Sequence, residues 1–283
     1  MRTVPLTHQR VTIQDDFDLD KILESGQCFR PRKLADGRCR FVSGKALLYL
    51  TPLGCGQYDA AWYGADWDVW AGYFDLGRSY AALRQSLAGQ SAYLDAALAF
   101  GQGIRVLRQD RWEALCSFII SQNNNIKRIK GIIERLCRLL GQSIGDSGFF
   151  SFPTPEALAA ATADQLAPLR CGFRARYLID AAQKVCSGQV RLDAIPSMPL
   201  EEAHRELMQI CGVGPKVADC VLLFGFHRLE CCPMDVWMKR VFAVLYPNGL
   251  PDCARDFAGI AQQYLFHYAR TCPQAFDPEE VSA

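Results

Sequence analysis

Apolar and polar residues alternate in short runs through the first third of the chain. The pairs Asp36-Gly37 and Ser43-Gly44, which favour tight turns, separate these runs. The pattern predicts strands at residues 27–32, 38–42 and 47–51. After them, Ser79 can cap a helix that continues to about Phe100. Residues 1–98 are therefore expected to form an antiparallel sheet domain with helices.

From Arg105 onward the spacing of apolar residues is helical. In the clearest case, residues 126–140, isoleucine and leucine recur at intervals of three and four, and basic residues fill the opposite face. Further helices are predicted near residues 155–163, 174–186, 199–211, 216–224, 235–246 and 252–270. The expected fold class is α+β, with an all-helical domain over residues 99–283 and a frayed acidic end at residues 277–280.

The run Gly212-Val213-Gly214-Pro215 separates two of these helices. Two glycines allow a sharp turn, and Pro215 suits the first turn of a new helix. Such a turn directs backbone N–H groups, including those of Gly212, Gly214 and Val217, toward a position where a phosphate can bind. An ordinary corner between two packed helices fits the turn equally well.

Lys216 follows the turn, at the end of the helix where the dipole disfavours positive charge. That repulsion and partial burial favour the neutral amine, which is a nucleophile. Cys220 lies one turn later on the same face. The pair therefore suggests chemistry at this corner.

Asp235 precedes another helical run and is a typical helix N-cap. Helix N–H groups would hold the negative charge of its carboxylate. A structural cap alone explains the residue. A fixed carboxylate near an amine would also stabilise the positive charge that develops on a sugar when its glycosidic bond breaks.

Charge is distributed unevenly along the chain, although the net charge is only +1. Residues 101–141 hold eight Lys and Arg against three Asp and Glu, and residues 170–191 hold five against one. Residues 1–98 hold eleven of each kind. The middle of the chain therefore provides either a phosphate-contacting surface or a solvated basic face.

The thirteen cysteines favour reduced thiols in a cytoplasmic or nuclear compartment, because their number is odd and no signal peptide is visible. No pair has Cys-x-x-Cys spacing, and the adjacent Cys231 and Cys232 are poorly spaced for zinc. We expect no side-chain metal site and no membrane association.

The motif GVGPKVADC at residues 212–220, followed by PMDV at residues 233–236, resembles the helix–hairpin–helix DNA glycosylases with a Gly/Pro-rich loop and a catalytic aspartate. Within that superfamily the chain most resembles the 8-oxoguanine DNA glycosylase/lyases. Four more segments are similar to family segments in the same order: SGQCFRPR (25–32), SFIISQNNNIKRI (117–129), CGFRARY (171–177) and AGIAQQYLF (258–266). Only two cysteines follow Asp235, so the iron–sulfur loop of some relatives is absent.

The resemblance implies a set of contacts to the damaged base. The backbone carbonyl of Gly26 would accept a hydrogen bond from the N7–H that distinguishes 8-oxoguanine from guanine. Cys220 and Phe266 would sandwich the base, and Gln262 would hold its pairing edge. From the residues alone, Gly26 could simply turn the chain, and the other three could be core residues of amphipathic helices.

The resemblance also implies contacts around the gap that a flipped base leaves in the duplex. Asn123 would fill the gap, and Phe173 would stack as a wedge. Arg128 and Arg174 would contact the cytosine left without a partner. From the residues alone, the three consecutive asparagines fit a polar loop that caps a helix.

For the hairpin, the resemblance implies a cation held by the backbone carbonyls of Met208, Ile210 and Val213. The chain departs from the family pattern at two positions. Trp237 stands where a phosphate-contacting histidine is usual, so it offers one N–H and no charge. Pro215 replaces a threonine, which suits a helix start.

The expected function is base excision with strand cleavage, in which Lys216 attacks the sugar and Asp235 supports the sugar cation. One alternative is a monofunctional glycosylase that cleaves alkylated purines with water and Asp235, although Lys216 argues against it. Another is a non-catalytic DNA-binding module, which leaves Asp235 unexplained. We expect a monomer without cofactors that binds double-stranded DNA containing oxidised guanine, in the cytoplasm at a bacterial nucleoid or in a eukaryotic nucleus.

Overall fold

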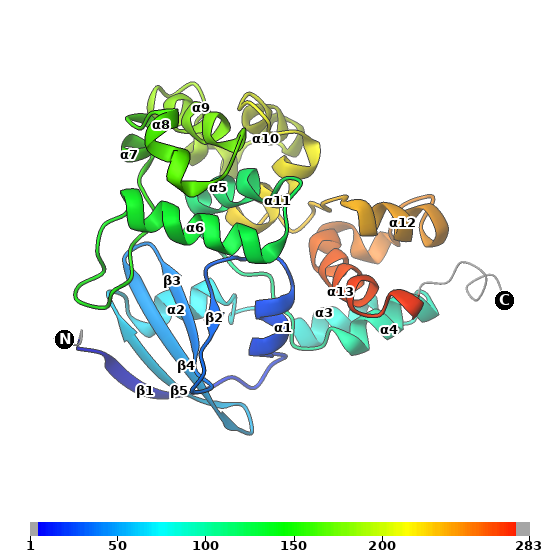
Figure 1. Ribbon diagram of the computed structural model, residues 1–283. Helices are drawn as coiled ribbons and strands as arrows, with labels where there is room; N and C mark the ends of the chain where they lie inside the picture. Colours follow the sequence, from blue (N-terminus) through cyan, green and yellow to red (C-terminus); the bar gives the residue numbers. More distant parts are fainter. Residues whose placement is uncertain (1–4, 276–283) are drawn as a thin grey trace.

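The computed structural model describes residues 5–275 of the chain (Figure 1). A five-stranded antiparallel sheet in the order β1-β5-β4-β3-β2 lies at one end, with helices above and beside it. The strands are β1 (Thr7–Thr12), β2 (Arg32–Lys33), β3 (Cys39–Ser43), β4 (Ala46–Gly54) and β5 (Gln57–Tyr63). The predicted α+β class is therefore confirmed.

Two of the three predicted strands are present as β3 and β4, but the strand predicted at residues 27–32 is wrong except for its last residue. This segment is a loop because the side chain of Gln27 replaces sheet pairing. Its amide donates to Ser25 Oγ and to the carbonyl of Arg105, each at 2.8 Å, and accepts from the N–H of Leu107 at 2.7 Å.

The apolar pattern does not predict β1 or β5. β1 pairs with β5 from Thr7 opposite Trp62 to Thr12 opposite Gln57. Five of the six β1 residues are exposed, so β1 lacks the apolar alternation that marks a half-buried strand. β1 forms because it pairs with β5, a strand far along the chain, and not because of its own residue pattern.

The helices α1 (Leu19–Glu24) and α2 (Trp67–Tyr73) cover one face of the sheet. Phe41 of β3 packs edge-on against Phe74 at the end of α2, with ring centroids 4.9 Å apart. The opposite face carries Val42 and Leu47, which pack with Ile144 from a distant loop. The sheet therefore has a core of its own.

The single helix predicted from Ser79 to Phe100 is two helices, α3 (Tyr80–Leu87) and α4 (Ala92–Phe100). Gly89 has φ +79° and breaks the run, and Ser91 caps the second helix through the N–H of Leu94. Both helices share the hydrophobic core of the helical region.

The remaining helices form the larger part of the molecule. They are α5 (Arg111–Ser121), α6 (Ile126–Leu140), α7 (Pro155–Ala159), α8 (Ala163–Leu166), α9 (Arg174–Cys186), α10 (Leu200–Met208), α11 (Pro215–Gly225), α12 (Val236–Leu245) and α13 (Ala258–Thr271), with short 3-10 turns between some of them. The helix predicted at residues 252–270 begins with such a turn, Asp252–Phe257. The acidic residues 277–280 lie outside the described part of the chain.

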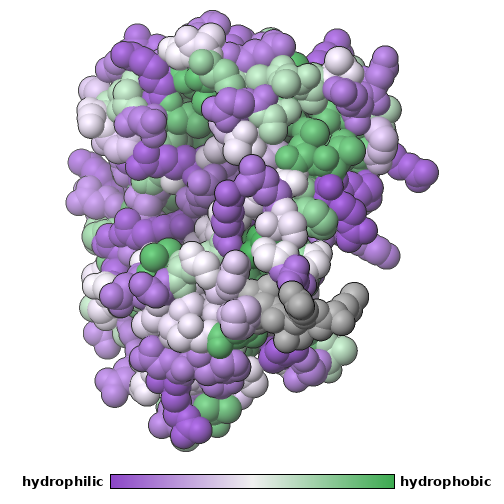
Figure 2. Space-filling model, turned by 90° about the vertical axis from the view of Figure 1, so that its left-hand side faces the viewer, coloured by the Kyte–Doolittle hydropathy of each residue, from purple (hydrophilic) through white to green (hydrophobic). Residues whose placement is uncertain are grey.

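None of the described helices has both the length and the apolar composition that a bilayer span requires. On the face shown in Figure 2, hydrophilic residues predominate and hydrophobic residues gather in separate patches.

Close packing at Gly259 fixes the start of α13. Its N–H donates to the carbonyl of Leu229 at 2.8 Å. A Cβ at this position would lie 2.3 Å from Cδ1 of Leu223 and 2.6 Å from the carbonyl oxygen of Cys231. Only glycine allows this approach, which sets the position of the whole helix.

We expect Gly259→Ala to lower the free energy of unfolding by about 1–3 kcal/mol, because the added methyl group meets backbone as well as side chain. Denaturant unfolding measures the change. Gly72→Ala is the matched control, since Gly72 lies in a helix with open space around it. That control should be neutral or stabilising by up to about 1 kcal/mol. Equal stabilities of the two variants would contradict the packing argument.

His267 on α13 generates a pH dependence. The imidazole ring is buried, and its centroid lies 5.3 Å from that of the Phe100 ring. Burial, together with the nearby charge of Arg270, lowers the pKa of His267 to about 4. The unfolded chain binds this proton below about pH 6.5, whereas the folded chain does so only near pH 4. Stability should therefore fall as pH drops from about 6.5 to about 4, by up to about 1.4 kcal/mol per unit. Unfolding curves of wild type and His267→Gln should diverge in this window, and parallel curves would refute the assignment.

Candidate active site

The turn before α11 has the geometry that the sequence predicts. Gly214 is the N-cap of α11 and Pro215 its first residue. Gly212 has φ +79°, and a Cβ there would lie 2.4 Å from Cδ2 of Tyr177. Glycine is required at 212 for both reasons, and the turn places Lys216 in the first turn of α11.

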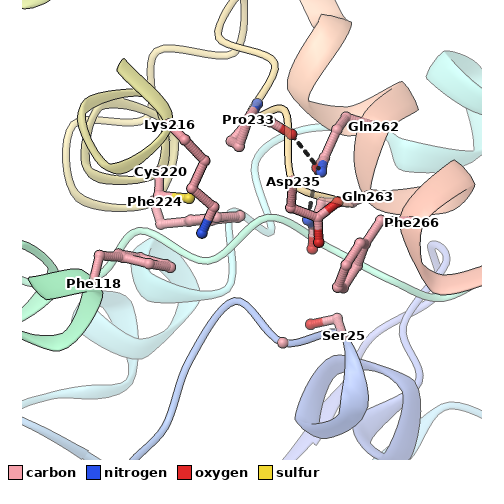
Figure 3. A pocket seen from close by; sticks show the side chains of 11 residues that line it. Ser25, Phe118, Lys216, Cys220, Phe224, Pro233, Asp235, Gln262, Gln263 and Phe266 are labelled. Carbon is pink, nitrogen blue, oxygen red and sulfur yellow. Dashed lines mark hydrogen bonds between the residues drawn. The ribbon is translucent and has the colours of Figure 1, made fainter. Parts of the chain in front are cut away.

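Lys216 is half-buried, and its amine points into a cavity (Figure 3). Its Nζ lies 5.9 Å from the ring centroid of Phe118 on α5. The thiol of Cys220, one turn later on α11, lines the same cavity. Burial raises the pKa of Cys220 to about 11 although Lys216 opposes the shift, so the thiol is a neutral wall of the cavity near pH 7.

Asp235 is the N-cap of α12, as predicted. Its Oδ1 accepts a hydrogen bond from the N–H of Met238 at 2.9 Å. The residue is half-buried, and it lines the cavity that contains Lys216. Its role as a cap and its place in the pocket are therefore compatible.

This cavity has a volume of about 60 Å³ and lies between five segments of the chain. Its lining residues are Ser25, Gly26, Phe118, Lys216, Cys220, Phe224, Pro233, Asp235, Gln262, Gln263 and Phe266. Figure 3 shows α11 on one side of the cavity, α13 on the other, and the loop after α1 below. All six residues that the sequence assigns to catalysis and base binding therefore meet in one place.

Gly26 closes the cavity from the N-terminal side. It has φ +79°, and a Cβ there would lie 3.3 Å from both Phe266 Cε1 and Arg270 Nη1. The guanidinium of Arg270 hydrogen-bonds to the carbonyl of Glu24 and stacks 5.2 Å from the ring centroid of Phe266. The loop and α13 are thus held in direct contact.

Two buried glutamines of α13 form the opposite wall. Gln262 donates to the carbonyl of Pro233 at 3.2 Å and accepts from Nε2 of Gln263 at 2.9 Å. Both bonds fix the orientation of the Gln262 amide. Oε1 of Gln263 is buried and has no hydrogen-bond partner in the described structure, so it is a candidate acceptor for a bound molecule.

A second hollow of about 410 Å³ adjoins this pocket and shares Lys216 and Asp235 with it. Asn123, Gly214 and Val217 also line this hollow. Asn123 is exposed and has φ +46°, at the turn between α5 and α6. The predicted gap-filling residue and the predicted phosphate-binding turn therefore face one groove beside the amine.

Arg174 is not free on the surface. Only 3% of it is exposed, and its guanidinium donates to the carbonyls of Gln122, Asn123 and Cys171. It also stacks on the ring of Phe173, 4.5 Å from the centroid. In this structure Arg174 therefore holds the Asn123 turn in place.

Arg128 and Phe173 lie at the surface. Arg128 donates to the carbonyl of Arg170 at 3.1 Å, and 44% of Phe173 is exposed. The side chain of Asn125, rather than of Asn123, caps α6 through the N–H of Arg128 at 2.9 Å. Both surface residues are accessible to a large ligand beside the groove.

The proposed backbone cation site falls within one turn. The N–H of Val213 bonds to the carbonyl of Ile210 at 3.0 Å, which leaves a second lone pair on that oxygen. Carbonyl oxygens suit a hard cation, and the cation at Met208, Ile210 and Val213 that the resemblance implies stays a prediction.

Several residues at the pocket were not predicted from the sequence. Phe118, Phe224 and Gln263 line the pocket, but they lie on amphipathic helices and look like ordinary core residues. Arg270 contacts Phe266, but it looks like a basic residue near a helix end. The polar side chain of Gln263 in an otherwise apolar stripe was the one available signal.

Two family models match the chain. Residues 10–115 match the 8-oxoguanine DNA glycosylase N-terminal domain, and residues 116–250 match the HhH-GPD superfamily base excision DNA repair proteins. The fold and pocket are thus those of an HhH-GPD base excision repair protein. Within that class, the chain belongs to the 8-oxoguanine DNA glycosylase family.

Individual relatives agree with this assignment. The solved complex described as MBOgg1 with a low-affinity DNA ligand is 39% identical, with a TM-score of 0.86 over 94% of this chain and 96% of that one. The Clostridium acetobutylicum 8-oxoguanine glycosylase/lyase bound to double-stranded DNA is 33% identical, with a TM-score of 0.83 over 96% of this chain and 99% of that one. An N-glycosylase/DNA lyase of Saccharomyces cerevisiae is 41% identical over 154 residues, 50% of this chain. The chain spans 41% of the length of that curated relative.

Proposed function

We propose that this protein removes 8-oxoguanine from double-stranded DNA and then nicks the strand at the resulting abasic site. The observation that carries the proposal is one cavity lined by an amine, Lys216, and a carboxylate, Asp235. Relatives named glycosylase/lyase support the same activity.

The chemistry begins with the uncharged amine of Lys216. Its nitrogen bonds to C1′ of the flipped nucleotide while the bond from C1′ to the base breaks, and the base leaves with that electron pair and takes a proton. Asp235 stabilises the positive charge on the sugar. The nitrogen then loses one proton, and its lone pair forms a double bond to C1′ as the C1′–O4′ bond breaks and O4′ takes up a proton. Loss of a proton from C2′ expels the 3′ phosphate and nicks the strand.

Recognition of the base depends on the walls of the cavity. The carbonyl of Gly26 would accept from the N7–H of 8-oxoguanine and repel the lone pair of guanine. Cys220 and Phe266 would stack on the two faces of the base, and Gln262 would bind its pairing edge. The ring of the half-buried Phe266 lies at the edge of this cavity, where it can stack on a base that enters.

The groove beside the cavity would hold the DNA. Asn123 would fill the gap in the duplex, and the turn before α11 would bind a phosphate through backbone N–H groups. Arg128 and Arg174 would favour cytosine opposite the lesion, and Phe173 would stack next to it.

Two other functions make different predictions. A monofunctional alkylpurine glycosylase needs no amine at the sugar, and a DNA-binding module needs neither Lys216 nor Asp235 in a cavity.

We further propose that the protein acts as a monomer without cofactors, wherever the cell keeps its DNA.

Borohydride should trap a covalent complex between wild-type protein and a duplex that contains 8-oxoguanine, because it reduces the carbon–nitrogen double bond. Lys216→Gln should bind the same duplex and trap nothing. Gel separation of trapped complexes measures the difference. Lys45→Gln is the control, since Lys45 is exposed in the turn between β3 and β4. Wild-type protein that binds the lesion without base release would leave only the DNA-binding module.

We expect Arg174→Ala to reduce the preference for cytosine opposite the lesion. Loss of the bonds from this guanidinium frees the Asn123 turn, and such charged bonds are worth about 1.5–3 kcal/mol. The ratio of excision rates opposite cytosine and adenine should fall about tenfold or more. Arg176→Ala, an exposed position on the same helix, should change the ratio little. An unchanged ratio in Arg174→Ala would remove this arginine from the recognition scheme.

A further inference from the structure

A second cluster of reactive side chains lies outside the cavity. His204 on α10, Asp219 on α11 and Cys231 in the segment before α12 bring one imidazole nitrogen, one carboxylate oxygen and one sulfur within 4.8 Å of one another. His204 Nε2 lies 2.7 Å from Asp219 Oδ1. The proposed reaction uses none of these groups.

The hydrogen bonding of His204 determines which nitrogen is available. Nδ1 lies 3.0 Å from the carbonyl oxygen of Leu200, and a carbonyl can only accept, so Nδ1 carries a hydrogen. In the neutral ring, Nε2 then presents a lone pair to the carboxylate of Asp219. The lone pairs of His204 Nε2 and Asp219 Oδ1, 2.7 Å apart, repel each other unless a proton or a cation lies between the two atoms. A backbone carbonyl on the far nitrogen is the usual arrangement for a metal-binding histidine.

The surroundings favour a cation over water alone. Only 2% of Cys231 is exposed, and the side chains of His204 and Asp219 are about one-fifth exposed. Negative charge on both Asp219 and Cys231 is costly at this spacing unless a positive charge lies beside it. A bound divalent ion offsets that cost and displaces the thiol proton to solvent.

We propose that His204, Asp219 and Cys231 bind a zinc-like divalent cation. Nitrogen, oxygen and sulfur are the three ligand types of Zn²⁺, and a tetrahedral site spaces them roughly 3.3–3.8 Å apart. The three ligand atoms lie between 2.7 and 4.8 Å from one another, so small side-chain rotations would bring them to this spacing. His204 also lines a surface cavity of about 490 Å³, and water would be the fourth ligand.

The ion would join three segments that position the active site. α10 leads into the hairpin, α11 carries Lys216, and the segment at Cys231 leads to Asp235. The site is separate from the backbone cation site of the hairpin, and the proposal does not depend on the proposed enzymatic activity.

The test is a titration of chelator-treated full-length protein with Zn²⁺. We expect one equivalent to bind and the melting temperature to rise with Zn²⁺ concentration, because the ion binds only the folded state. Cys231→Ser and His204→Gln should each weaken binding at least tenfold. With Co²⁺ in place of Zn²⁺, a sulfur-to-metal charge-transfer band should appear in wild type and vanish in Cys231→Ser.

Exposed thiols provide the matched controls. Cys211→Ser and Cys253→Ser should bind Zn²⁺ as wild type does, because both cysteines lie at the surface outside the cluster. Circular dichroism confirms that each variant is folded, and Cys231→Ser decides the question if His204→Gln does not fold. The proposal is wrong if wild type binds no ion, which would make the cluster an imidazolium–carboxylate pair. It is also wrong if binding survives both cluster substitutions.

Discussion

The buried amide of Gln27 joins two parts of the molecule that the pocket needs at a fixed separation. It bonds to the backbone of Arg105 and Leu107 in the loop before α5, and the side chain of Gln109 donates a hydrogen bond to the carbonyl of Gln27 at 2.7 Å. That segment leads directly into α5, which supplies Phe118. Gly26 precedes Gln27 and is thereby pressed against α13. Loss of this amide would leave buried backbone groups unsatisfied and the pocket without its lower wall.

Backbone groups also orient several polar side chains around the rest of the site. Asp235 is held by a helix N–H, Gln262 by the carbonyl of Pro233, and Arg174 by the carbonyls of the Asn123 turn. Backbone positions are set by packing, including the close approach at Gly259. Small changes in packing far from the amine can therefore alter its surroundings.

Local patterns in the sequence were enough to predict some of this arrangement. The turn, the N-cap at Asp235 and the helical placement of Lys216 follow from nearest neighbours. Gly26, Gln262 and Phe266 could be assigned only through the family resemblance, because nothing local distinguishes them from turn or core residues. β1 and the loop at Gln27 were missed since both depend on partners far along the chain. The grouping of His204, Asp219 and Cys231 was not predicted for the same reason, because these residues come from three segments.

The contact between Phe266 and Arg270 has a consequence for selectivity. The guanidinium of Arg270 lies 5.2 Å from the ring centroid of Phe266 and is bonded to the carbonyl of Glu24, so this wall of the pocket is braced. Under the proposed function, every base that enters the pocket would press against this same braced ring. Selectivity would then include how long an extruded base remains at the entrance, as well as how tightly it is held once inside.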